Sequence, residues 1–123
     1  MESGLVTAFR TIVVPVEVLD DQHNSLFIDA MIDTGFNGNL TLPVDVLNSL
    51  GAKLFGTRLV ELADGSLVQL DSYLIVVKWF GNEGEVLAIE SESEPLLGMS
   101  MLWGSRVSFD AVDGGALTIE EIA

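Results

Sequence analysis

The apolar residues of this chain come in short blocks separated by turn-forming residues, and this pattern limits the fold more than any other feature. The blocks are rich in Val, Ile and Leu, and the segments between them contain Gly, Asp and Asn. Such blocks favour strands joined by hairpin turns. No block approaches the length of about 20 apolar residues that a membrane-spanning helix requires. We therefore expect residues 1–123 to form one soluble domain with a single core.

Four hairpins can be placed along the chain. They are Phe9–Leu19 with Ser25–Asp33, Thr57–Leu62 with Leu67–Phe80 across Ala63–Ser66, Leu67–Phe80 with Glu85–Ser91 across Gly81–Gly84, and Arg106–Val112 with Ala116–Ile122 around "DGG". Together they give about seven or eight short strands, which indicates a mainly β fold that closes, or nearly closes, into a β-barrel.

Helical structure is expected at only two places. The segment Leu42–Gly51 has Pro43 in its first turn and Gly51 as a C-terminal stop, and Val44, Leu47 and Leu50 share one face. A short helical turn is expected within "GMSMLWG", after a tight turn at "PLLG". The fold prediction is therefore a β-barrel with one or two short helices.

The charge and the cysteine content exclude several classes of function. The formal net charge is -14, with 5 basic and 19 acidic residues, so the chain would repel both nucleic acid and anionic membranes. The absence of cysteine rules out disulfides, thiol nucleophiles and thiolate metal sites. The N-terminal residues lack the pattern of a secretion signal. We expect a cytoplasmic protein that binds neither nucleic acid nor membrane.

One motif stands out for its chemistry. An apolar run ends in Asp33, which is followed by Thr34 and Gly35. Glycine permits a sharp turn and close approach by another chain, and the threonine hydroxyl can hold a loop by hydrogen bonding to backbone. The pattern indicates that Asp33 is a functional carboxylate at the end of a strand.

Taken with its context, this motif resembles the retroviral-type aspartic proteases, the single-domain relatives of pepsin. The matching segments are "MIDTG" (Met31 to Gly35), the hairpin tip "ADGS" (Ala63 to Ser66) and "PLLGMSML" (Pro95 to Leu102). Their order and spacing cover roughly Phe9 to Ile119. The resemblance implies a retropepsin-like barrel and hydrolysis of peptide bonds without a metal or another cofactor.

The resemblance also implies roles for individual residues. Asp33, Thr34 and Gly35 would form the catalytic loop, with Asp33 as the catalytic aspartate and Thr34 holding two such loops together. The residues implied to surround the substrate are Phe36, Asn37, Ala63, Asp64, Gly65, Leu97 and Gly98. The mechanism needs two carboxylates that share one proton, and each chain has one such motif. A homodimer with an Asp33 from each copy is therefore expected.

Two positions differ from the family pattern. Phe36 stands where a small residue is common after the glycine, and it is expected to narrow the nearest subsites. At the C-terminus, "IEEIA" places two acids among the apolar residues that would form an interleaved interface between two copies, to which Ile119 and Ile122 are expected to contribute.

Other interpretations remain open at this stage. The fold could serve as a non-catalytic, dimeric module that holds an extended peptide by strand addition. His23, with Asp20 and Asp21, could form a metal site, although solvated turn residues are the preferred interpretation. "DAVDGG" lacks the twelve-residue pattern of a calcium loop and indicates a hairpin turn.

Overall fold

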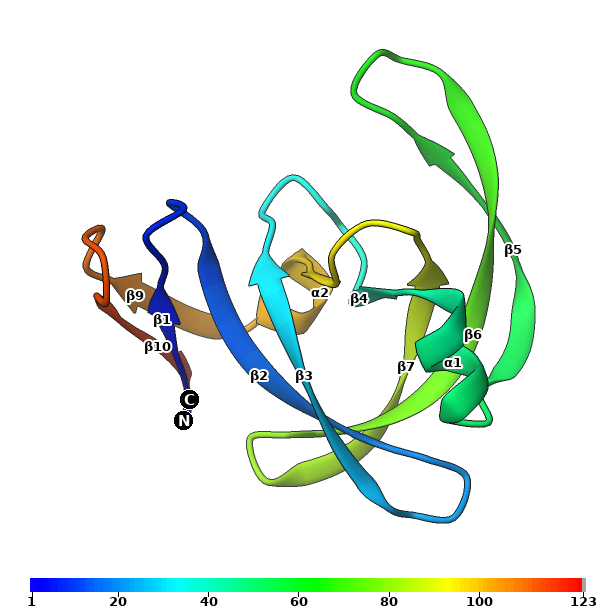
Figure 1. Cartoon of the computed structure of the whole chain (residues 1–123), viewed down its shortest axis with the longest axis horizontal. Coiled ribbons are helices and arrows are strands. Elements are labelled where there is room, and N and C mark those ends of the chain that lie inside the picture. The colour runs from blue at the N-terminus through cyan, green and yellow to red at the C-terminus, as the bar shows by residue number, and fades with distance from the viewer. Residues whose placement is uncertain (123) are drawn as a thin grey trace.

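A computed structural model describes residues 1–122 as a mainly β domain with ten strands and two short helices (Figure 1). The strands are β1 (Glu2–Val6), β2 (Ile12–Leu19), β3 (Ser25–Ile32), β4 (Leu40–Leu42), β5 (Lys53–Glu61), β6 (Leu67–Trp79), β7 (Asn82–Glu90), β8 (Leu96–Leu97), β9 (Ser105–Phe109) and β10 (Ala116–Glu121). The helices are α1 (Val44–Ser49) and α2 (Met99–Leu102). The predictions of a mainly β fold and of one or two short helices are confirmed.

Six strands close into a ring. Their order is β6, β7, β4, β8, β3 and β2, and pairing between β2 and β6 completes the circuit. The strands β1, β10 and β9 continue from β2 on one side, and β5 pairs with β6 on the other. The expected closure is thus present as a ring of six strands within a ten-stranded sheet.

Strand alternation directs the apolar side chains into the ring. Val14, Val16 and Val18 of β2 are buried, whereas Pro15 between them is exposed. Leu47 and Leu50 of the α1 region are also buried and join the same core. Burying one such side chain contributes about 1.5–3 kcal/mol relative to leaving it in water, so this core stabilises the frame that holds the loops.

The structure corrects three local predictions. Val44 is 42% exposed, so it does not share the buried face of Leu47 and Leu50. The β6–β7 turn consists of Phe80 and Gly81, both with positive φ, because Asn82 already pairs with Trp79. The segment "PLLG" was expected to be a tight turn, but Leu96 and Leu97 form a strand because β3 on one side and β4 on the other pair with them. The strands β1, β4 and β8 are additional to the predicted hairpins.

The two terminal strands pair with each other within the chain. β1 and β10 are antiparallel, with Glu2 opposite Ile119, and the two ends of the chain lie side by side (Figure 1). Ile119 has no exposed surface, because its side chain belongs to the protein's own core. The expected contribution of Ile119 to an interface between copies is therefore wrong in this structure, while Ile122 is exposed.

Among residues 1–122, neither helix is long and apolar enough to span a membrane.

Candidate active site

The loop that carries Asp33 is positioned by the two-residue strand β8. β8 lies between β3 and β4 and pairs with both, parallel to β3 and antiparallel to β4. The Asp33 amide donates to the Leu97 carbonyl at 3.0 Å, and the Thr41 hydroxyl accepts from the Leu96 amide at 2.9 Å. The segment between β3 and β4 must therefore cross over the end of β8, and Asp33 is its first residue.

The carboxylate of Asp33 is held by its own turn. Its Oδ1 accepts a hydrogen bond from the Gly35 amide at 2.9 Å, and the Phe36 amide donates to the Asp33 carbonyl at 3.2 Å. An aspartate side chain that accepts from the amide two residues later is a common way to close a turn. The turn leaves Asp33 partly exposed and Thr34 exposed at its apex.

A second loop, beginning at Gly98, packs beneath this turn. The Gly98 amide donates to the Asn39 carbonyl at 2.9 Å, and the Met99 amide donates to the Phe36 carbonyl at 2.8 Å. The Ser100 hydroxyl donates to the Asn37 carbonyl at 2.5 Å. The expected proximity of the Asp33 and Gly98 loops is therefore confirmed, and backbone hydrogen bonds join them.

A cleft of about 680 Å³ opens above the Asp33 turn. One wall is the crossing loop, and the other is the β5–β6 hairpin, which curves back over it (Figure 1). The lining residues are Asp33, Gly35, Phe36, Asn37, Gly38, Thr41, Arg58, Val60, Glu61, Leu62, Ala63, Leu70, Ile89, Ser91 and Leu96. A carboxylate thus faces a mostly apolar cleft covered by a hairpin.

The tip of the covering hairpin is closed by Asp64. Its Oδ1 accepts from the Ser66 hydroxyl at 2.6 Å and from the Ser66 amide at 2.9 Å. The hydrogen bond from the Ser66 side chain is the main reason that the pKa of Asp64 lies below its usual value. Gly65 has a φ of +84°, which glycine adopts without strain. The tip is therefore an ordered turn held by an ionised carboxylate.

The structure brings together five of the ten predicted site residues. These are Asp33, Gly35, Phe36, Asn37 and Ala63, which all line the cleft. The other five lie around it, with Thr34 at the apex of the turn, Asp64 and Gly65 in the hairpin tip, and Leu97 and Gly98 buried beneath the loop. Leu97 has no exposed surface, so it supports the loop from the core.

The wall formed by β5 was missing from the sequence prediction. Arg58 and Val60 alternate along this strand and line the cleft. Glu61 and Leu62 at the end of the strand also line it, as does Leu70, which pairs with Arg58. The period of two could have identified this face, but only the curvature of the hairpin shows that it turns toward Asp33. Thr41 was also missed, because its side chain accepts a hydrogen bond from Leu96, which is 55 residues away in the sequence.

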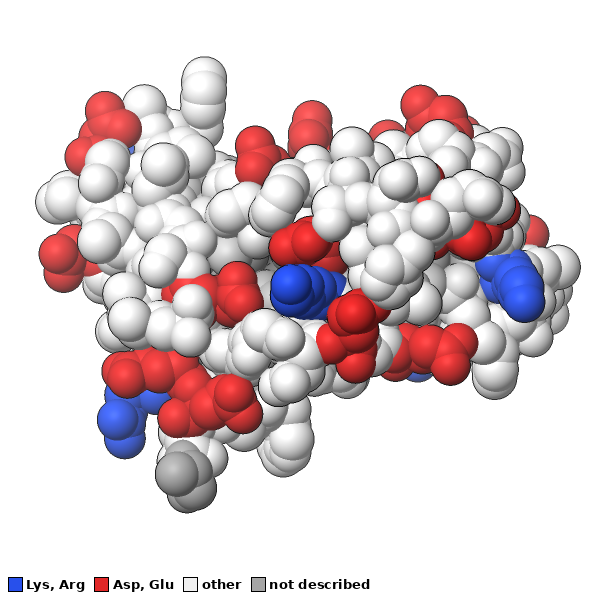
Figure 2. All heavy atoms as spheres, turned by 90° about the horizontal axis from the view of Figure 1, so that it is seen from below, with Lys and Arg blue, Asp and Glu red and all other residues white. Residues whose placement is uncertain are grey.

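The end of the molecule opposite the loop that follows β3 is strongly acidic. Figure 2, seen from the side of the β2–β3 and β6–β7 turns, shows acidic side chains spread over this face with few basic ones between them. In the β2–β3 turn, hydrogen bonding, first from the Asn24 amide, lowers the pKa of Asp20. His23 Nε2 lies 3.1 Å from Glu83 Oε1. Within residues 1–122 no group of three His, Cys, Asp or Glu side chains is placed to hold a metal ion.

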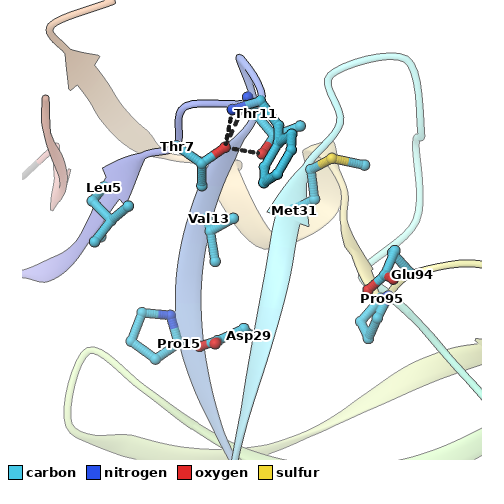
Figure 3. A pocket seen from close by; sticks show the side chains of 11 residues that line it. Leu5, Thr7, Thr11, Val13, Pro15, Asp29, Met31, Glu94 and Pro95 are labelled. Atoms are coloured by element: carbon cyan, nitrogen blue, oxygen red, sulfur yellow. Dashed lines mark hydrogen bonds between the residues drawn. The ribbon is translucent and has the colours of Figure 1, made fainter. Parts of the chain in front are cut away.

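A second groove, of about 730 Å³, lies on the other side of β3 (Figure 3). Met31 and Pro95 form part of its lining, and Asp29 and Glu94 are its acidic members. The other lining residues come mainly from β1, β2 and the Thr7–Thr11 loop, where the two threonine hydroxyls are 2.7 Å apart. Although this groove is larger, it lacks a carboxylate held by backbone amides, so the Asp33 cleft is the better candidate for chemistry.

The Asp33 cleft contains two acids that could take part in proton transfer. Asp33 is fixed by the Gly35 amide on a loop that the core supports, whereas Glu61 extends from the last position of β5. Comparisons of this chain with protein-family models, with curated proteins and with solved structures give no match. The chemistry of the cleft therefore provides the basis for a functional proposal.

Proposed function

We propose that this protein is an aspartic endopeptidase of the retropepsin-like type, which acts as a homodimer on extended peptide segments. The observation that carries the proposal is the Asp33 turn. Its carboxylate accepts from the Gly35 amide, and it lines a cleft covered by the β5–β6 hairpin. A peptide held between the loop and the hairpin would present a backbone carbonyl to Asp33.

In the proposed reaction, the two Asp33 carboxyl groups of a dimer share one proton. The ionised carboxylate takes a proton from a water molecule, whose oxygen attacks the peptide carbonyl carbon. The protonated carboxyl group donates a hydrogen bond to the carbonyl oxygen. The tetrahedral intermediate then collapses as the C–N bond breaks, and the leaving nitrogen accepts the proton that the first carboxylate took from the water, which restores the pair with one shared proton. Two carboxylates at close range favour this arrangement because both cannot ionise together.

The case for a second copy rests on the surface beside Asp33. Thr34 is exposed at the apex of the turn and is free to meet the same residue of another copy. Nearby, Trp103 is 81% exposed and lines a hollow with Asn37, Met99 and Ser100. A large aromatic side chain at the surface is a frequent anchor of protein interfaces. Because β1 and β10 pair within the chain, we assign the contact between copies to this region.

A peptide-binding module without catalysis is the second candidate. β5 pairs only with β6 among the described strands, so its outer edge can accept an added strand. This function would use the same cleft but would not need the Asp33 carboxylate.

The decisive experiment measures cleavage of a mixed peptide library between pH 4 and pH 7 by the wild-type protein, Asp33→Asn and Glu61→Gln. We expect Asp33→Asn to reduce turnover to background, because an amide cannot act as the base that activates water. Glu61→Gln is the matched control within the same cleft, and it should keep turnover. A hydroxyl-bearing mimic of the tetrahedral intermediate should inhibit the wild-type protein.

Three results would contradict the proposal. Near-normal turnover by a folded Asp33→Asn protein would remove Asp33 from the mechanism. Loss of turnover in Glu61→Gln would instead assign the second carboxylate to Glu61 if the wild-type protein were also shown to be a monomer whose specific activity does not change on dilution. Binding of library peptides by both variants, with no cleavage by any of the proteins, would support the peptide-binding module.

A further inference from the structure

Arg58 is the basic residue among the cleft-lining side chains. It lies on β5 two residues before Val60, opposite Leu70 of β6. The chain has only 5 basic residues against 19 acidic ones, so the positive charge in the cleft is opposite in sign to the net charge of the protein. The remaining charged members of the cleft are Asp33 and Glu61.

The guanidinium of Arg58 is available to a ligand. Among residues 1–122, the one ion pair within 4.0 Å joins His23 and Glu83, so no acidic side chain there forms an ion pair with Arg58. Glu61 also lines the cleft, but its carboxylate forms no ion pair with Arg58 within that distance. A guanidinium presents a planar set of five donors that matches a carboxylate.

We infer that Arg58 determines the substrate class of this cleft by binding an acidic side chain of the peptide. This inference rests on the proposed endopeptidase function. Val60, Leu62, Leu70, Ile89 and Leu96 supply apolar surface in the same cleft. The preferred substrate is thus an extended segment with apolar residues at the cleaved bond and an acidic residue farther along.

Arg58 lies five residues before Ala63 of the hairpin tip, a span of roughly 17 Å for an extended chain. The positions to be tested for an acidic residue therefore extend about five residues to each side of the cleaved bond. In a symmetric dimer each copy supplies one Arg58, so an acidic residue is recognised on both sides.

The net negative charge of the protein limits the preference for an acidic residue to those peptide positions that contact Arg58. Long-range repulsion from a chain of net charge -14 is screened over about 8 Å at physiological salt, whereas a direct contact with Arg58 is not. A glutamate that contacts Arg58 should increase cleavage. A glutamate beside Asp33 or Glu61 should decrease it.

The test uses a cleavable peptide with an apolar centre and glutamine flanks, into which a single glutamate is introduced at each flanking position in turn. For the wild-type protein we expect kcat/KM to rise about fivefold to tenfold at one position on each side. The ratio of the glutamate peptide to the glutamine peptide is compared within each variant, so changes in overall activity cancel. Arg58→Gln should bring this ratio close to one, and Arg58→Glu should favour lysine at the same positions.

Lys53→Gln is the matched control. Lys53 is on the same strand and its loss changes the net charge equally, but it does not line the cleft, so the ratio should stay at the wild-type value. Equal rates for the glutamate and glutamine peptides at every position would overturn the role of Arg58, as would an unchanged ratio in Arg58→Gln. Failure of the wild-type protein to cleave even the glutamine peptide would instead overturn the endopeptidase proposal.

Discussion

The ring of Phe36 lies directly over Gly98. A β-carbon added to Gly98 would be 2.6 Å from Cδ2 of the Phe36 ring and would also collide with the carbonyl oxygens of Phe36 and Gly38. A β-carbon on Gly38 would be 2.6 Å from Cζ of the same ring. The aromatic residue after the Asp-Thr-Gly motif is therefore accommodated by two glycines, and it is part of the packing between the two loops as well as a wall of the cleft.

Replacing Gly98 should destabilise the protein. Gly98→Ala is expected to lower the free energy of unfolding by about 1–3 kcal/mol, because the new methyl group meets backbone oxygens that cannot move without breaking the loop. Chemical denaturation provides the measurement, and Gly84→Ala is the control because a β-carbon there meets no atom within 4 Å. Adding Phe36→Ala should not restore stability, since the backbone collisions remain. Full rescue by Phe36→Ala would show that the ring alone excludes a side chain at Gly98.

Shortening Phe36 should affect both packing and specificity. The ring is partly buried, so Phe36→Ala should lower the free energy of unfolding by about 1–2 kcal/mol, less than for a fully buried phenylalanine. The emptied space adjoins the cleft, so peptides with larger apolar residues at the cleaved bond should gain in relative kcat/KM. Denaturation and a peptide panel measure the two effects. An inactive variant of unchanged stability would mean that the ring takes part in the chemistry.

The dimer should depend on Trp103. Trp103→Ala is expected to raise the dissociation constant of the dimer by about tenfold, since a buried aromatic anchor often contributes this much to an interface. Sedimentation or light scattering, together with specific activity across a dilution series, measures the change. Phe55→Ala removes another exposed aromatic residue, on β5, and should leave the dissociation constant unaltered. Added salt should strengthen the dimer, because it screens the repulsion between two chains of net charge -14.

The hairpin tip should keep its structure in mild acid. The pKa of Asp64 is lowered in the folded protein, first by the Ser66 hydroxyl, so its stabilising effect is present above the unfolded value of 3.8. That effect is lost only as the pH falls through the lower folded value. Hydrogen exchange of the Ser66 amide should therefore reveal the same protection by the tip hydrogen bond at pH 5 and pH 7, once the intrinsic rates are taken into account.

Removing the tip carboxylate should loosen the cover of the cleft. Asp64→Ala is expected to speed exchange of the Ser66 amide and to raise KM by about threefold to tenfold, because the tip would then have to be ordered on binding. Asp113→Ala, in the β9–β10 loop, is the control and should alter neither quantity. Unchanged exchange in Asp64→Ala would show that the backbone turn holds the tip without the carboxylate.

The sequence alone determined the local elements. Alternating apolar residues, such as Val14, Val16 and Val18, specify strands with one buried face, and a glycine or aspartate between two such runs specifies a hairpin. The Asp-Thr-Gly motif marked Asp33 as the candidate carboxylate for the same local reason, since its side chain closes its own turn. The strands, the hairpins and the Asp33 turn depend on residues close together in the chain, so the local sequence pattern is enough to predict them.

Only the tertiary structure decided which distant segments meet. β8 has two residues, too few for a periodic signal, and it is a strand only because β3 and β4 flank it. Arg58 lines the same cleft as Asp33 because a long hairpin curves over the loop, and Ile119 is buried because β10 pairs with β1 of the same chain. Such contacts depend on the curvature and closure of the whole sheet, to which many residues contribute small amounts, so no short stretch of sequence specifies them.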